Sequence, residues 1–95
     1  MGRSANYEIK ETAQLLYFPT INAKATGERI RELRKKCDLK VKEIQEFLGL
    51  ATNQSVYKWE SGASMPTLDN IVALAKVLDT TIDNIIVIEN VPKAG

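Results

Sequence analysis

Residues 52–62 read TNQSVYKWESG, and the fold is decided by this stretch. Thr52 is a residue type that caps helix N-termini, and Gly62 suits the left-handed conformation in which many helices end. Val56 and Trp59 lie three positions apart, so they share one face of a helix. The positions around them are mostly polar. The stretch therefore predicts a short helix with one buried face and one exposed polar face.

Two amphipathic helices are predicted before this one. A helix over residues 26–37 has Thr26 as its N-cap, and a second helix ends at Gly49. Charged residues separate the apolar positions of both helices, which gives each helix one apolar face. The apolar positions are Ile30, Leu33 and Cys37 in the first helix, and Val41, Ile44 and Leu48 in the second.

Two further helices are predicted after it. Pro66 breaks the chain, Thr67 caps the fourth helix, and either Thr80 or Thr81 starts a short fifth one. Their inner faces are assigned to Leu68, Ile71, Leu74, Ala75 and Leu78, followed by Ile82, Ile85 and Ile86. Five helices in this order predict a compact all-α domain. Its core is expected to contain Ile30, Leu33, Ile44, Leu48, Val56, Trp59, Ile71 and Leu74.

Two short apolar segments flank the helices. Residues 15–18 form an apolar run that Pro19 stops, and residues 87–88 are β-branched, so both segments favour extended structure. The two segments can pair as a small ribbon, either within one chain or between the chains of a dimer. The expected organisation is an N-terminal extension over 1–23, a helical domain over 24–88 and a tail over 89–95.

The composition excludes several classes of function. The chain has 95 residues, no His and a single Cys, which fits one domain without a disulfide, a metal cluster or His-based catalysis. No apolar run approaches the ~20 residues of a membrane helix and no secretory signal is recognisable, so a cytoplasmic protein is expected. Cys37 is expected to be a small buried residue, and a redox sensor is the alternative. A binding protein without a cofactor fits this composition better than an enzyme.

The net charge of +1 is unevenly distributed along the chain. Residues 24–62 carry nine basic and six acidic side chains, a net charge of +3, whereas the rest carries four basic and six acidic ones. A basic segment of this kind fits a face that is directed toward a polyanion. The alternative is an ordinary solvated helix face.

The order and spacing of these helices resemble the phage repressor and Cro-type (lambda-repressor-like) helix-turn-helix family of prokaryotic regulators. The resemblance rests on residues 27–34, on residues 52–62 with their Trp-Glu-x-Gly ending, and on residues 65–78 and 81–86. It covers roughly residues 24–88. It implies a five-helix domain that binds double-stranded DNA, usually as a two-fold homodimer on a pseudo-palindromic site.

The family's third helix enters the major groove, which implies residues 53–61 as the recognition helix here. The implied base-reading residues are Asn53, Gln54 and Lys58. Side-chain amides form two-pronged contacts with adenine, and a lysine suits guanine or a phosphate. The alternatives are a capping role for Asn53 and plain solvent exposure for Gln54 and Lys58.

Phosphate contacts are expected at the start of the second helix, because helix N-termini favour anions. Lys40 and Lys42 flank this N-terminus, and a solvated rim is the alternative for both. Three further candidates lie in or near the third helix, namely Ser55, Tyr57 and Ser61. For Tyr57 the alternative is packing over the domain edge.

The sequence departs from the family pattern around the second helix. Lys40 and Val41 stand where the family has Thr-Gln, and a valine side chain cannot hydrogen-bond a phosphate. Gln45 occupies a position that is usually Ala, and one extra residue lies between Gly49 and Trp59. We interpret the last two departures as one adaptation, in which a wider turn admits a larger side chain.

Two functions remain open at this point. The first is a sequence-specific DNA-binding regulator, of the repressor type. The second is a protein-interaction module on the same fold, such as an antitoxin-like or anti-repressor partner, which the weak basic charge and the missing amide favour. An enzyme is disfavoured because the sequence contains no clustered catalytic groups.

Overall fold

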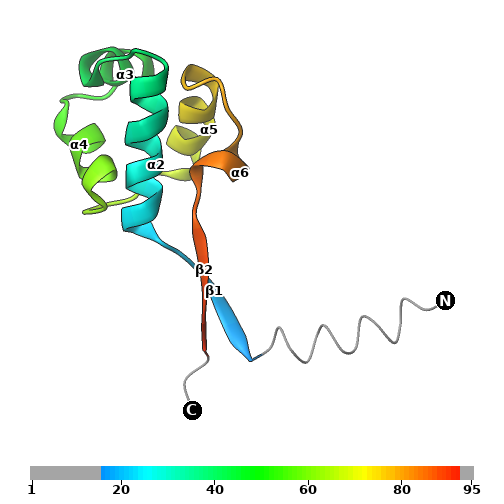
Figure 1. Ribbon diagram of the computed structural model, residues 1–95. Helices are drawn as coiled ribbons and strands as arrows, with labels where there is room; N and C mark the ends of the chain where they lie inside the picture. The colour runs from blue at the N-terminus through cyan, green and yellow to red at the C-terminus, as the bar shows by residue number, and fades with distance from the viewer. Residues whose placement is uncertain (1–15, 93–95) are drawn as a thin grey trace.

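The structure, a computed structural model, describes residues 16–92 and places five helices in one body, from which a two-stranded ribbon projects (Figure 1). The elements in chain order are β1 (Tyr17–Ile21), α2 (Ala23–Lys36), α3 (Val41–Leu48), α4 (Gln54–Ser61), α5 (Leu68–Val77), α6 (Ile82–Ile85) and β2 (Ile88–Pro92). Helix α2 contacts α4 and α6, and helix α3 contacts α4 and α5. The longest helix, α2, therefore packs between α4 and α6.

Helix α2 begins earlier than its sequence pattern predicts. Its N-cap is Asn22, whose side-chain oxygen accepts a hydrogen bond from the Ala25 amide at 2.9 Å, so the prediction of Thr26 as the cap is wrong. Thr26 is fully buried, and its hydroxyl accepts a hydrogen bond from the Val87 amide at 2.9 Å. The Asn22 amide in turn donates to the Val87 carbonyl at 2.8 Å. The start of α2 is therefore bound to the segment between α6 and β2.

The other helix ends agree closely with the local chemistry of the sequence. Gly49 ends α3 and Gly62 ends α4, and both adopt left-handed conformations, with φ of 69° and 81°. Thr67 caps α5 and Thr81 caps α6 through their side-chain oxygens. Helix α4 is the exception, because Asn53 rather than Thr52 is its N-cap residue. The Thr52 hydroxyl still accepts a hydrogen bond from the Gln54 amide at 3.2 Å.

The core contains six of the eight residues that the sequence predicts for it. Its buried members are Ile30, Val41, Ile44, Val56, Trp59, Ile71, Leu74, Leu78 and Ile85. Leu33 and Leu48 are only partly buried and pack against this cluster. The assignment of Leu68 to the inner face of α5 is wrong, because 74% of its surface is exposed. Leu68 is the first residue of α5, and the buried residues of this helix begin with Ile71.

Cys37 is half-buried just after α2, and its thiol donates a hydrogen bond to the Leu78 carbonyl at 3.3 Å. Within residues 16–92, no three His, Cys, Asp or Glu side chains come close enough to hold a metal ion. In the same range, no helix has both the length and the apolar character needed to cross a membrane.

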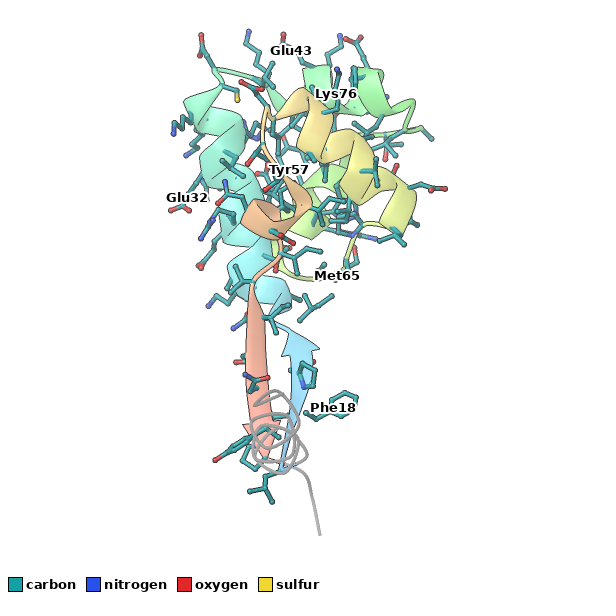
Figure 2. All side chains as sticks on the ribbon, turned by 90° about the vertical axis from the view of Figure 1, so that its right-hand side faces the viewer. Phe18, Glu32, Glu43, Tyr57, Met65 and Lys76 are labelled. Atoms are coloured by element: carbon teal, nitrogen blue, oxygen red, sulfur yellow. The ribbon has the colours of Figure 1, made fainter. Side chains whose placement is uncertain are left out.

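The ribbon adds two strands to the predicted all-α fold. Strands β1 and β2 pair antiparallel, with Ile21 opposite Ile88 and Phe18 opposite Val91. The predicted apolar segments are shifted relative to this pairing: residue 15 lies outside the described range, and residues 89–92, predicted as tail, form most of β2. Every residue of both strands is exposed, and Figure 2 shows Phe18 projecting from the ribbon well away from the helices.

Replacing Thr26 by Val tests the hydrogen bond between α2 and the segment that leads into β2. The variant keeps the shape of the side chain but leaves the part-buried Val87 amide without its acceptor, which costs about 1–3 kcal/mol of unfolding free energy. Urea unfolding followed by circular dichroism measures this loss. Thr20→Val, at an exposed position of β1, is the control and should change stability by less than about 0.5 kcal/mol. Equal stability of the two variants would contradict a stabilising hydrogen bond between the Thr26 hydroxyl and the Val87 amide.

Candidate nucleic-acid interface

Helix α4 has two chemically different faces. Val56 and Trp59 are buried in the core, at 0% and 5% exposure. Gln54, Tyr57 and Lys58 are exposed on the opposite side of the helix. Because the buried residues fix the orientation of α4, the polar side chains have to face the solvent.

An ion pair between Arg34 of α2 and Glu60 of α4 joins the two helices. The Arg34 Nε atom donates to one carboxylate oxygen at 2.6 Å, and Nη2 donates to the other at 3.1 Å. The Nη1 atom donates to the Leu39 carbonyl at 3.0 Å, so the same guanidinium also binds the turn before α3. The hydrogen bonds to Glu60 raise the pKa of Arg34 above its ordinary value, against the lowering effect of burial. Arg34 therefore stays charged at every pH in common use.

The backbones of α2 and α4 also approach each other closely at Gly27. A side chain at this position would collide with the Trp59 carbonyl oxygen and with the Glu60 backbone. Gly27 is buried within α2 and has ordinary helical backbone geometry. Glycine is required here by space rather than by backbone conformation, and α4 is held directly against α2.

An open surface hollow lies where the exposed sides of α2 and α4 meet. It is lined by Arg31, Arg34, Gln54, Tyr57, Lys58, Glu60 and Ser61. The structure therefore brings together four of the residues that the sequence predicts for the site, which are Gln54, Tyr57, Lys58 and Ser61. Two arginines, one lysine and a single carboxylate, which Arg34 neutralises, give the hollow an excess of positive charge.

Arg31 is the residue that sequence reasoning missed. It is exposed, and it lines the hollow beside the polar face of α4. A signal for it was present in the sequence, since Arg31 lies four residues after Gly27 and three before Arg34. Residues at this spacing share one face of a helix, here the face of α2 that meets α4.

Asn53 differs from the other predicted base-reading residues. It is half-buried at the start of α4, and its Oδ1 atom is buried without a hydrogen-bond partner among the described residues. A two-pronged contact with adenine needs both the oxygen and the nitrogen of the amide. In this conformation the Asn53 oxygen is not accessible for that contact, whereas Gln54 is exposed.

The predicted phosphate-contacting residues are spread over a wider surface. Ser61 is exposed, but its hydroxyl already donates to the Lys58 carbonyl and accepts from the Ala63 amide, so it closes the end of α4. Ser55 is half-buried in the first turn of α4. Lys40 and Lys42 are exposed at the N-terminal end of α3 and do not line the hollow.

The turn between α3 and α4 accommodates the unusual Gln45. Its side-chain amide donates a hydrogen bond to the Leu50 carbonyl, across the turn that Gly49 opens. The long side chain thus satisfies a backbone acceptor in the turn instead of crowding it. At the start of α3, the Lys40 amide donates to the Glu43 carboxylate at 2.9 Å, so an acidic side chain lies beside this N-terminus.

Replacing Arg34 by Met tests how much α4 depends on the ion pair. Both side chains of the pair are largely buried, at 13% and 7% exposure, so the variant leaves the Glu60 carboxylate unpaired and should cost about 3–5 kcal/mol in unfolding free energy. Urea unfolding measures the loss, and Arg31→Met on the exposed side of α2 is the control. Adding Glu60→Leu to Arg34→Met should recover stability, because the unpaired charge is then removed. A double variant less stable than Arg34→Met would contradict this explanation.

Comparison with known proteins connects this geometry to a family. A family model described as helix-turn-helix matches residues 30–85, which is more than half of the chain. The matched segment runs from within α2 to the end of α6 and contains the ion pair, the turn and the whole of α4.

Three curated relatives share this segment. The chain is 38% identical over 53 residues to an HTH-type transcriptional regulatory protein of Pyrococcus furiosus, covering 56% of this chain and 16% of the relative. It is 32% identical over 63 residues to repressor protein C2 of Salmonella phage P22, covering 66% of this chain and 29% of the relative. It is 34% identical over 59 residues to the HTH-type transcriptional regulator YobD of Bacillus subtilis, covering 62% of this chain and 52% of the relative. The chain thus spans about half or less of the length of these relatives.

Two solved structures have a similar fold. The P22 c2 repressor, in a crystal structure with the synthetic operator 9T, matches with a TM-score of 0.59 and 32% identity, covering 63% of this chain and 89% of that chain. The restriction-modification controller protein C.AhdI of Aeromonas hydrophila matches with a TM-score of 0.62 and 30% identity, covering 67% of this chain and 96% of that chain. The likeness extends over nearly the whole of both solved chains. Since the helix-turn-helix family model spans most of the helical body, this chain belongs to the helix-turn-helix family.

Proposed function

We propose that this chain binds double-stranded DNA in a sequence-specific manner and acts as a transcriptional regulator of the repressor type. The observation that carries the proposal is the exposed polar face of α4, which the core and the Arg34–Glu60 pair hold in one orientation. A short helix with an exposed polar face suits insertion into the major groove, where side chains meet base edges.

Gln54 and Lys58 are the proposed base-reading residues. They lie one turn apart on α4 and both line the hollow. The Gln54 amide has the donor and acceptor that match adenine N6 and N7, and the Lys58 ammonium suits guanine O6 and N7. Asn53 would join them only if its side chain turned outward to free Oδ1. Its proposed role is therefore secondary to that of Gln54.

The proposed phosphate contacts surround this face. Arg31 and Tyr57 lie in the hollow, and Lys40 and Lys42 lie at the start of α3. Such contacts hold a protein in register on the duplex and supply affinity that does not depend on sequence. The two lysines stand in for the amide that the family usually has at this helix, and Glu43 beside them weakens the site for an anion.

The relatives support this function, and the general binding mode of helix-turn-helix proteins suggests its symmetry. Two of them are named transcriptional regulators and one a repressor, and the P22 c2 repressor is solved with its operator. Helix-turn-helix dimers bind two half-sites about one helical turn apart. We therefore propose a homodimer on a pseudo-palindromic operator.

Selection of bound sequences from a pool of random DNA tests the proposal directly. An enriched motif with two related half-sites, about 10 base pairs between centres, is the expected result. No enrichment and no mobility shift at low salt, together with a protein partner that co-purifies in stoichiometric amount, would favour the protein-interaction function instead.

The roles of individual residues predict different responses to substitution. Gln54→Ala should weaken binding to the selected sequence by about 1–3 kcal/mol and relax the preference at one position. Lys42→Ala should weaken binding to selected and random DNA alike. Fluorescence anisotropy with both kinds of DNA measures the difference, and Lys76→Ala on α5 is the control for loss of charge. An equal loss on both DNAs in Gln54→Ala would remove its base-reading role.

Salt dependence provides a separate test of the phosphate contacts. The logarithm of the binding constant should fall linearly with the logarithm of salt concentration, with a slope of about −0.9 per neutralised phosphate. Lys42→Ala should make the slope shallower by about one, because one contact is lost. The slope for Lys76→Ala should equal that of the unaltered chain. If Lys42→Ala leaves the slope unchanged, then Lys42 does not contact a phosphate.

A further inference from the structure

The ribbon has two faces of different character. Side chains alternate along each strand, and directly paired residues point to the same side of the ribbon. One side carries Tyr17, Pro19, Ile21, Ile88, Asn90 and Pro92, and we call it the uncharged ribbon face. The other side carries Phe18, Thr20, Glu89 and Val91. Only this second side bears a charge.

The uncharged ribbon face is open to solvent throughout the described chain. Ile21 and Ile88 lie directly opposite each other, and 46% and 62% of their surfaces are exposed. The ribbon leaves the helical body at the end where α2 begins, so none of the helices between residues 16 and 92 covers it (Figure 1). An isolated two-stranded ribbon is only marginally stable in water, and a further packed layer is what normally stabilises it. A covering partner for this face is therefore expected on energetic grounds.

We propose that the uncharged ribbon face packs against the same face of a second copy of this chain, around a two-fold axis. A two-fold interface brings each residue near its own copy or near a neighbour of that copy. The uncharged ribbon face meets this condition without placing like charges together. The opposite side would bring two Glu89 carboxylates close to each other, which is unfavourable. The choice of a second copy as partner rests on the proposed function, in which two chains bind the two half-sites of one operator.

The size of this face determines how strong the association can be. A five-residue strand is only about 17 Å long, so two strands offer less than the roughly 800 Å² per partner of a stable standard interface. The dimer is consequently weak in solution. Two copies held on adjacent half-sites have a high effective concentration, and there the same contact becomes cooperative DNA binding.

Another exposed apolar surface offers a clear alternative to the ribbon. Leu68 and Val72 lie one turn apart on α5, with 74% and 54% of their surfaces exposed. Association through α5 would depend on these residues and not on the ribbon. The test therefore has to compare the two surfaces.

The experiment places a lysine on each candidate surface. Ile88→Lys adds a charge to the uncharged ribbon face, Val91→Lys adds the same charge to the opposite side of the same strand, and Leu68→Lys adds it to α5. Sedimentation equilibrium over a range of concentrations should show self-association that Ile88→Lys weakens about tenfold or more, while the other two variants retain it. Circular dichroism shows whether each variant keeps its helices. Mixing Ile88→Lys chains with Ile88→Glu chains should restore association, because opposite charges then meet across the two-fold axis.

A DNA measurement separates failure of this inference from failure of the proposed function. Ile88→Lys should bind a single selected half-site as the unaltered chain does, and should lose only the cooperativity on two half-sites. Loss of association in Leu68→Lys but not in Ile88→Lys would overturn the ribbon interface. So would an unaltered chain that stays monomeric at every concentration and binds two half-sites without cooperativity. If no variant binds a half-site, the proposed DNA-binding function itself is wrong.

Discussion

The bidentate contact between Arg34 and Glu60 is the interaction on which the rest of the site depends. It joins α2 to α4 through two hydrogen bonds, and the third nitrogen of the same guanidinium binds the Leu39 carbonyl before α3. Three segments of the helix-turn-helix unit therefore share one charged group. A buried pair of this kind adds little net stability compared with apolar packing, but it is costly to break, so it specifies one arrangement of the helices.

Helix α2 makes contacts on two sides, one with α4 and one with the chain that leads into β2. On the side of α4, Gly27 leaves room for the helix backbone, and Arg31 reaches the exposed hollow one turn later. On the other side, Thr26 accepts a hydrogen bond from the chain that leads into β2. One helical turn of α2 thus connects the polar face of α4 with the exposed ribbon. The proposed DNA-binding surface and the proposed association surface therefore both adjoin α2.

The sequence predicts helix ends well wherever a single local interaction decides them. Gly49 and Gly62 adopt the left-handed conformation, and Thr67 and Thr81 accept the hydrogen bonds of their caps. It fails at the start of α2, because Asn22 and Thr26 are both suitable caps and the local pattern does not distinguish between them. The tertiary contact of Thr26 with a residue 61 positions later settles the matter. Such a pairing has no signature in a local window.

The sequence by itself determined the helix order, most of the core and the polar character of α4, because these follow from periodicity and from local capping. It also placed Gln54 and Lys58 on the exposed face of α4, since Val56 and Trp59 are buried on the opposite face. Only the tertiary structure decided which polar groups share the hollow and which point elsewhere. The position of Arg31 in the hollow and the register of the ribbon depend on packing between segments that are distant in the chain. Those contacts are long-range, and periodicity carries no information about them.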